Sequence, residues 1–229
     1  NKAPVVAEAN GNWTVTFASA ELPSGEISSG AAGRTISVYS VDPAGNVSPT
    51  ITHTLDVDTV VRNFSFPAPD LIGATNTGGT DATTLNAVER QAGLPVQGTV
   101  EPGSSVTLTV GTWSQTIPAS QTTSGTWTTT IPASALPEGN NASVTISVTA
   151  RDQYGNVSQT LQNTIPIDTV VTDFPVSAIS LGAASDGWLN AREAHQGMTI
   201  SGISEVGSNV AVEIGGVAKA TTTDATGTW

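Results

Sequence analysis

Carboxylate side chains recur at fixed places in this sequence, and most of them lie in predicted turns. Asp58 and Asp168 each open an Asp-Thr-Val-Val segment, and Glu101 and Glu205 each open a Glu-x-Gly-Ser segment. Asp152 opens Asp-x-x-Gly-Asn-Val-Ser, a segment that occurs twice. Calcium takes about six to eight oxygen ligands from carboxylates, carbonyls and water, whereas zinc sites favour His and Cys. If these acids meet in space, their chemistry therefore favours calcium over zinc.

The elements that must position these acids are predicted to be β-strands. Residues 105–110 and 143–148 alternate apolar side chains with Ser or Thr, which places the apolar set on one face of a strand. Strands with one buried and one wet face favour an antiparallel sandwich, and helix signals are poor. Strands are predicted to start just after residue 58 and to cover roughly residues 95–100, 106–111, 115–118, 127–131, 144–150 and 157–167. About seven short strands in one unit predict an all-β, immunoglobulin-like sandwich.

The sequence also repeats itself with a period close to the length of one small domain. The segment Leu-Asn-Ala-Val-Glu at 85–89 returns as Leu-Asn-Ala-Arg-Glu at 189–193. A Gly-x-Trp segment occurs at 11–13, 125–127 and 227–229. The Trp of this segment is interpreted as a packing residue that opens a strand and caps the core.

These repeats divide the chain into three parts. Residues 1–58 are predicted to be the C-terminal part of one Ig-like repeat, 59–168 a complete repeat, and 169–229 the N-terminal part of a third. The two incomplete parts together have about the length of one unit. Two explanations are open: the sequence is a slice of a longer array, or successive copies complete each other head to tail, as in a filament.

An immunoglobulin-like topology brings three of the predicted turns to one end of the complete repeat. We therefore expect Asp58, Glu101 and Asp152 to converge there, and Asp56 could join them from the preceding strand. Carboxylates this close together repel each other unless a cation neutralises them. The predicted cofactor is Ca²⁺.

The next repeat boundary offers an incomplete version of the same group. Asp168 and Glu205 persist, but the counterpart of Asp56 is Pro166. A site at this boundary would need another ligand or would bind calcium more weakly.

A second candidate group lies in the loop before the second predicted strand, at the opposite end of each unit. Its potential ligands are Asp81, Asn86 and Glu89 in the complete repeat and Asp186, Asn190 and Glu193 in the third. An alternative interpretation applies to all of these acids, since Asp and Asn are ordinary turn residues that bond to their own backbone.

Composition argues against several classes of function. The chain carries 7 basic and 19 acidic residues, a formal net charge of −12, and these few cations form neither a nucleic-acid footprint nor a basic stripe for a membrane surface. The lack of cysteine rules out disulfides and thiolate metal sites. No apolar run approaches the length of a transmembrane helix, so we expect no membrane insertion. Catalytic motifs are also missing, and serines lack a paired base.

Two rivals to a purely structural role stay open. A carbohydrate- or protein-binding module would use Trp113 and Trp188, the two Trp residues that the repeats do not share. An accessory domain of a secreted hydrolase is the other rival.

Taken in order, the motifs Gly-x-Trp, Leu-Pro-x-Gly, Asp-x-x-Gly-Asn-Val-Ser, Asp-Thr, Leu-Asn-Ala-x-Glu and Gly-x-x-Glu-x-Gly-Ser resemble a known group. The chain is similar to the bacterial Ig-like tandem repeats of large type I-secreted, RTX-type and biofilm-associated adhesins. The resemblance implies an extracellular, non-catalytic extender between a cell-surface anchor and a distal ligand-binding tip, whose ligand stays unknown.

The resemblance also implies that calcium at domain junctions stiffens the rod. The implied junction ligands are Asp56, Asp58, Glu101, Asp152, Asp168 and Glu205. The implied partners are neighbouring repeats of the same chain or copies arranged head to tail, with no nucleic acid. Pro166 departs from the pattern and puts uniform calcium occupancy in doubt.

Overall fold

The computed structural model describes residues 5–27, 34–69, 84–140, 142–175, 180–184 and 186–229. The chain divides into two compact units. The first comprises Asn1–Ala68, Gln97–Thr129 and Ile146–Asn163, and the second comprises Pro69–Val96, Thr130–Thr145 and Thr164–Trp229. These boundaries fall at other positions than the predicted repeat boundaries at residues 58 and 168, which stay predictions.

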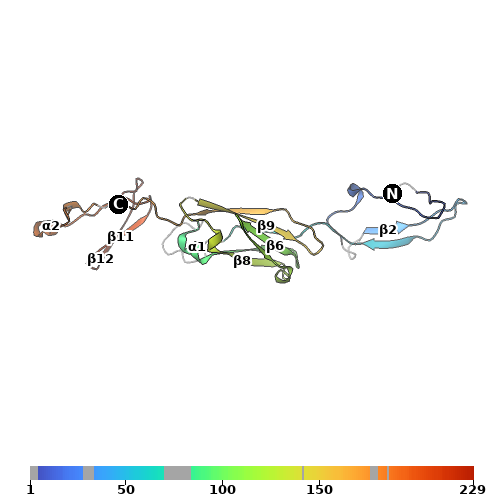
Figure 1. The fold of residues 1–229 in the computed structure, drawn as a ribbon, viewed down its shortest axis with the longest axis horizontal. Helices are drawn as coiled ribbons and strands as arrows, with labels where there is room; N and C mark the ends of the chain where they lie inside the picture. Colours follow the sequence, from blue (N-terminus) through green and yellow to red (C-terminus); the bar gives the residue numbers. More distant parts are fainter. Residues whose placement is uncertain (1–4, 28–33, 70–83, 141, 176–179, 185) are drawn as a thin grey trace. The chain divides into compact units, whose positions relative to one another are not determined.

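Six strands between residues 94 and 167 form two antiparallel sheets (Figure 1). They are β5 (Leu94–Thr99), β6 (Ser105–Val110), β7 (Trp113–Ile117), β8 (Thr126–Ile131), β9 (Ala142–Arg151) and β10 (Leu161–Ile167). One sheet has the order β10-β9-β6-β7, and the other pairs β5 with β8. The all-β sandwich predicted from the alternating pattern is confirmed.

The core follows from this alternation, because successive side chains of a strand point to opposite faces. In β6 the side chains of Val106 and Leu108 are 0% exposed, while Thr109 between the apolar positions is exposed. In β9 the side chains of Ile146 and Val148 are also 0% exposed. Leu108 lies directly opposite Val148 in the ladder, so the two central strands contribute to the same core.

Two of the predicted strands are wrong in part. The strand expected just after residue 58 is absent from the described residues 59–69, which form no regular strand. Ser65 nevertheless runs beside β5, because its backbone N–H donates to the Thr99 carbonyl oxygen at 3.0 Å and its side-chain oxygen accepts from the Thr99 N–H at 3.1 Å. A hydrogen bond to the Ser65 side chain therefore replaces part of the backbone hydrogen bonding expected of a strand beside β5.

The last predicted strand begins later than the alternation indicates. Val157 forms only an isolated bridge with Arg151, and β10 starts at Leu161. The Ser158 hydroxyl accepts the Ala150 N–H at 2.8 Å, so a side chain takes the place of a backbone acceptor there.

The remaining strands form two-stranded sheets in the flanking segments. β1 (Glu26–Ile27) pairs with β4 (Val57–Asp58), β2 (Arg34–Val38) pairs with β3 (Ile51–Leu55), and β11 (Asn209–Ile214) pairs with β12 (Val217–Thr222). The α-helices are α1 (Ala87–Ala92) and α2 (Ala191–Gln196), and the 3-10 helices are η1 (Ser19–Glu21), η2 (Ala119–Gln121), η3 (Ala133–Ala135) and η5 (Gly182–Ala184). Among the described residues, no helix combines the length and apolar character needed to cross a membrane.

In the middle repeat the Trp of the Gly-x-Trp segment packs in the core, as predicted, whereas Trp13 of the first copy is 54% exposed. Trp127 is only 2% exposed, and its ring centroid lies 5.8 Å from that of Phe66. A Cβ atom added to Gly98 would lie 2.7 Å from Trp127 Cε2 and Cζ2. The glycine in β5 therefore provides the space that the indole fills.

We expect Gly98→Ala to destabilise the sandwich by about 1–3 kcal/mol, because the added methyl group overpacks the contact with Trp127 and the Ser65 carbonyl group. Gln97→Ala is the matched control, since Gln97 is the exposed neighbour in the same strand, and we expect it to change stability by less than about 0.5 kcal/mol. Urea unfolding followed by Trp fluorescence measures both. Equal stabilities of the two variants would contradict this account of Gly98.

Candidate metal centre

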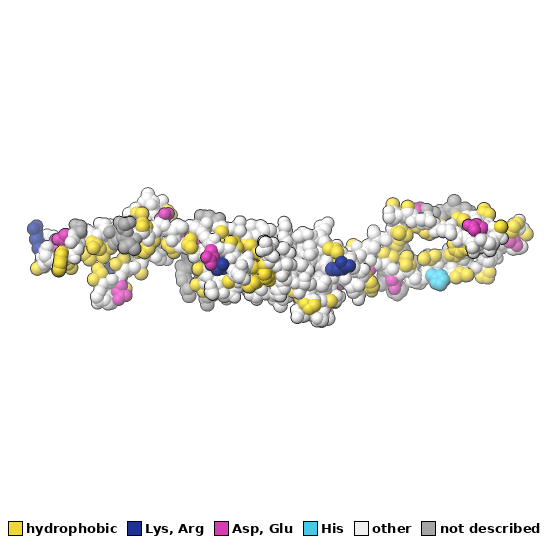
Figure 2. Space-filling view, viewed as in Figure 1, with side chains coloured by type: hydrophobic (Ala, Val, Ile, Leu, Met, Phe, Trp, Pro, Cys, Tyr) yellow, Lys and Arg dark blue, Asp and Glu magenta, His cyan; other side chains and the backbone are white. Residues whose placement is uncertain are grey.

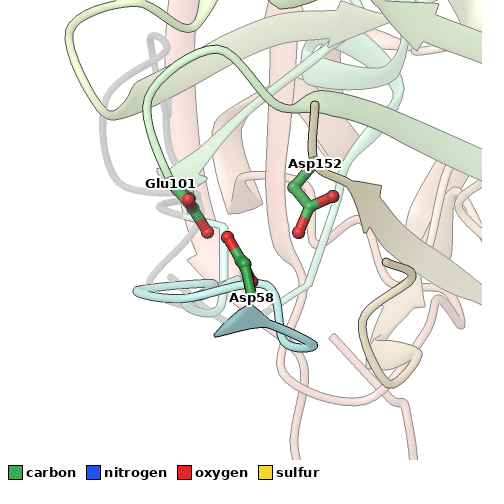
Figure 3. A group of neighbouring side chains, drawn as sticks. All are labelled: Asp58, Glu101 and Asp152. Carbon is green, nitrogen blue, oxygen red and sulfur yellow. The ribbon is translucent and has the colours of Figure 1, made fainter. Parts of the chain in front are cut away.

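Three carboxylates converge at one end of the strands β6 and β9 (Figure 3). One oxygen from each of Asp58, Glu101 and Asp152 lies within 4.8 Å of the others. Glu101 and Asp152 are buried, with 6% and 7% of their surface exposed, and Asp58 is half-buried. These are three of the four acids that the sequence places together.

The register of the central ladder explains why two of these acids are neighbours. Ser105 at the start of β6 lies opposite Arg151 at the end of β9. Glu101 lies in the turn just before β6, and its carbonyl oxygen accepts the Ser104 N–H at 3.1 Å. Asp152 directly follows Arg151, so the same register pair positions both turns.

Asp58 lies in the segment before the sandwich. Its position is fixed by strand pairing and by two hydrogen bonds of the following residue, which are called the clamp below. Asp58 lies opposite Glu26 in the β1–β4 pair. The next residue, Thr59, donates its N–H to the Gly25 carbonyl at 3.0 Å and accepts the Gly25 N–H on Oγ1 at 2.8 Å. The Gly of Leu-Pro-x-Gly and the Thr of Asp-Thr are therefore bonded to each other.

The same clamp forms at the next boundary. Thr169 donates its N–H to the Gly139 carbonyl at 3.0 Å and accepts the Gly139 N–H on Oγ1 at 2.9 Å. The clamp is thus a repeated feature of the chain.

Asp152 also accepts hydrogen bonds from residues of its own turn. Its Oδ1 accepts backbone N–H groups from Tyr154 and Asn156, both at 2.9 Å, and its Oδ2 accepts the Asn156 side-chain amide at 2.7 Å. This is the local bonding that makes Asp a common turn residue. The ordinary-turn interpretation therefore explains why an acid stands here, but not why two further acids surround it.

Asn156 is a residue of the site that the sequence analysis missed. Its Nδ2 donates to Asp58 Oδ1 at 3.1 Å and to the Asp58 carbonyl oxygen at 3.2 Å, besides its bond to Asp152. Turning the amide by about 180° would present Oδ1 in place of the two donors. The signal that could have found it is the Asn in both copies of Asp-x-x-Gly-Asn-Val-Ser.

Among the described residues, Arg62 forms an ion pair with one of the three acids. Arg62 Nη2 lies 3.6 Å from Glu101 Oε1, and the Arg62 backbone N–H donates to Glu101 Oε2 at 3.1 Å. Because the Arg62 side chain is 46% exposed, solvent screens its charge. Three carboxylates against one partly solvated guanidinium leave an excess of negative charge, and their hard oxygen donors fit Ca²⁺.

Asp56 and the acids of the next boundary lie outside this group. Asp56 is exposed. Asp168 Oδ1 accepts the Val170 N–H at 3.3 Å. Glu205 accepts the Thr172 N–H on Oε2 at 3.2 Å and the Asn140 side-chain amide on Oε1 at 3.1 Å. Their roles as calcium ligands stay predictions.

The second candidate group contains two helix N-caps. Asn86 Oδ1 accepts the N–H groups of Val88 and Glu89 at 2.9 and 3.0 Å, and Glu89 Oε2 accepts the Asn86 N–H at 3.0 Å. Asn190 and Glu193 form the same reciprocal capping box. The spacing Asn-x-x-Glu is the sequence signal for a helix start, which the sequence analysis interpreted only as a ligand pattern.

The remaining members of that group are Asp81 and Asp186. Asp81 lies outside the described residues. Asp186 Oδ1 accepts the Trp188 N–H at 2.9 Å, and the Trp188 side chain is 79% exposed. Trp113, in β7, is half-buried. Carbohydrate binding stays a prediction that attaches mainly to Trp188.

Comparison with known proteins supports the fold class. Residues 67–169 match the model of the bacterial Ig-like domain family, an interval that contains β5 to β10. The immunoglobulin-like class predicted for this part of the chain is thereby confirmed. No curated protein matches the sequence.

The solved structures that are similar to this chain include two adhesin structures. One is described as "Structural insight into host cell surface retention of a 1.5-MDa bacterial ice-binding adhesin", with 26% identity, a TM-score of 0.42, and coverage of 97% of this chain and 68% of the other. The second is described as "Crystal structure of tetra-tandem repeat in extending region of large adhesion protein", with 18% identity and a TM-score of 0.32. That match covers 88% of this chain and about half, 48%, of the other.

We expect Asn86→Ala to destabilise the protein by about 1 kcal/mol, because the first turn of α1 loses its side-chain cap. The loss should be the same in calcium and in EDTA if Asn86 acts as a cap. Gln91→Ala, an exposed change in the same helix, is the control. Thermal unfolding measures both, and a loss seen only in calcium would assign Asn86 to a metal site instead.

The equivalent turn of the first repeat gives a pH-dependent prediction. Asn46 donates its side-chain amide to Asp42 Oδ2 at 2.7 Å, and this bond is the largest cause that lowers the pKa of Asp42 below its ordinary value of 3.8. The stabilisation is therefore present above the ordinary pKa and is lost as the pH falls through the lowered one. Asn46→Ala should raise the pKa of Asp42 towards 3.8, as measured by NMR titration. An unchanged value would contradict this cause.

Proposed function

We propose that this segment is a non-catalytic structural extender of a bacterial cell-surface adhesin or extracellular fibre, in which calcium at the repeat junctions stiffens the chain. The proposal includes type I secretion and a role in adhesion or biofilm formation. It is supported by the sequence repeats, by the Ig-like match of residues 67–169 and by the ordered motifs that resemble adhesin repeats.

One observation carries the proposal. Asp58 belongs to β4, which pairs with β1 in the first predicted repeat, whereas Glu101 and Asp152 belong to turns of the sandwich that follows. A cation bound by all three carboxylates would therefore be held by both repeats at once. Because the fold itself brings these ligands within 4.8 Å, little conformational entropy would be lost on binding.

The physical effect of such a cation is simple. Without it, the three carboxylates repel each other across the junction, and the linker can sample several angles. With it, the repulsion is replaced by attraction to a shared charge, and one angle is favoured. The length of the array then equals the number of repeats multiplied by the length of one unit.

The test is thermal unfolding of the whole chain in calcium, in magnesium and in EDTA. We expect a calcium-specific rise in Tm, since a ligand that binds only the folded state at about 100 times its Kd contributes about 2.7 kcal/mol. Asp152→Asn should remove most of this rise, because the turn bonds to Oδ1 can survive while the carboxylate charge is lost. Small-angle scattering of the same samples should show a narrower range of chain dimensions in calcium.

Asp42→Asn is the matched control. Asp42 makes the same turn contacts with Ala44 and Asn46 that Asp152 makes with Tyr154 and Asn156. Asp42 is exposed and lies outside the group of three carboxylates. We expect this variant to keep the full calcium response. Equal melting curves in all three solutions, or equal losses in the two variants, would contradict the proposal.

A further inference from the structure

The two predicted repeat boundaries have the same local backbone arrangement. The clamp formed by Thr59 at the first boundary is formed by Thr169 at the second. Four residues further on in each linker, Asn63 and Asp173 have positive φ angles of 52° and 57°. Residues other than glycine adopt this conformation rarely, so its occurrence at equivalent positions marks the same chain path. The side chains of the two boundaries can therefore be compared position by position.

A glutamate of the following repeat also makes the same backbone contact at both boundaries. Glu101 Oε2 accepts the Arg62 N–H at 3.1 Å, and Glu205 Oε2 accepts the Thr172 N–H at 3.2 Å. Glu101 is buried and Glu205 is half-buried. Because a carboxylate that is partly removed from water is costly unless it is paired, the second oxygen of each glutamate, Oε1, also needs a partner.

The partner of Oε1 differs between the two boundaries. At the first boundary, Arg62 Nη2 lies 3.6 Å from Glu101 Oε1, so the partner comes from the linker itself. At the second boundary, Asn140 Nδ2 donates to Glu205 Oε1 and to Thr172 Oγ1, both at 3.1 Å. The partner there comes from the preceding repeat, and the linker residue Thr172, which occupies the position of Arg62, is uncharged.

The sequence shows that a second position changes together with the linker residue. The residue after the clamped glycine is Asn140 at the second boundary and Glu26 at the first. The first boundary thus has an additional acid in the preceding repeat and an additional base in the linker, whereas the second has neutral residues at both positions. The chain has only 7 Lys and Arg residues, and Figure 2 shows them at isolated places on the face that it draws. An additional acid at a boundary is therefore not neutralised by a general excess of cations.

We propose that the residue after the clamped glycine and the residue at the position of Arg62 together determine which repeats can be joined. Glutamate at the first position requires arginine at the second, and asparagine at the first position accepts threonine at the second. Glutamate followed by threonine would bring two carboxylates together with neither the amide nor the base, and this mismatch is rejected. Asparagine followed by arginine leaves one acid with two donors, and this combination is tolerated.

This inference goes beyond the proposed function, because it concerns which repeats are neighbours and not which ion they bind. The main test changes only the second boundary and leaves Asp58, Glu101 and Asp152 intact. All measurements are made in EDTA. A chain without a calcium response would therefore not contradict the inference, and failure of the inference would not contradict the calcium proposal.

Hydrogen exchange of the Thr169 amide, followed by NMR on the whole chain, measures whether the second boundary is closed, because this N–H donates to the Gly139 carbonyl. We expect Asn140→Glu to accelerate this exchange about tenfold, since it replaces a hydrogen bond to a charged group by repulsion between two carboxylates. Adding Thr172→Arg should restore the original rate. Thr172→Arg alone should change the rate by less than about twofold.

Val171→Arg is the matched control for the position of the added base. Val171 precedes Thr172 in the linker and is 68% exposed. We expect the chain with Asn140→Glu and Val171→Arg to keep the fast exchange. The Leu108 amide in the centre of β6 is the internal control, and its unchanged exchange shows that the sandwich is intact. Equal rescue by the two arginine substitutions, or an unchanged Thr169 rate in Asn140→Glu, would overturn the proposal.

The reciprocal exchange at the first boundary keeps the test decisive if Asn140→Glu disturbs folding. The reporter there is the Thr59 amide, which donates to the Gly25 carbonyl at 3.0 Å. Arg62→Thr should accelerate its exchange, because two acids then lack their base, and Glu26→Asn in the same chain should slow it again. A fast exchange that Glu26→Asn does not reverse would overturn the proposed matching of the two positions.

Discussion

The pairing of β6 with β9 is the constraint on which both the core and the candidate site depend. Its interior register places Leu108 opposite Val148, which fixes the apolar face. Its last register pair, Ser105 with Arg151, brings together the turns that carry Glu101 and Asp152. A shift of this ladder by one residue would turn the apolar side chains outward and separate the two acids. Hydrophobic burial therefore holds the carboxylates together against their repulsion.

The sequence predicted those features of the fold that follow from the alternation of apolar and polar residues along a strand. Alternation in residues 105–110 and 143–148 predicted β6 and β9, and topology then predicted that Asp58, Glu101 and Asp152 converge. Features set by side-chain hydrogen bonds were harder to predict. The Ser158 hydroxyl accepts a backbone N–H where the start of β10 was expected. Asn86 and Glu89 form the capping box of a short helix in a stretch that was expected to be a loop. The central position of Asn156 depends on contacts with a residue nearly a hundred positions away, which no local pattern contains.

The two repeat boundaries share a backbone clamp but differ in the chemistry around it. Thr59 with Gly25 and Thr169 with Gly139 make the same pair of bonds. At the second boundary, however, the Asn140 amide donates directly to Glu205. The equivalent acid at the first boundary, Glu101, pairs with Arg62 instead. Repeats with one backbone connection can in this way differ in the charges that surround their junctions.

The packing of Trp229 on Gly202 bears on how such a chain folds as it is made. In the middle repeat, the corresponding residues Gly98 and Trp127 both precede β9 and β10 in the chain. Within each repeat, the indole can therefore find its glycine before the later strands have been synthesised. An emerging repeat would then leave the ribosome with its largest aromatic side chain already packed against the chain, which lowers the risk that neighbouring repeats of similar sequence exchange strands.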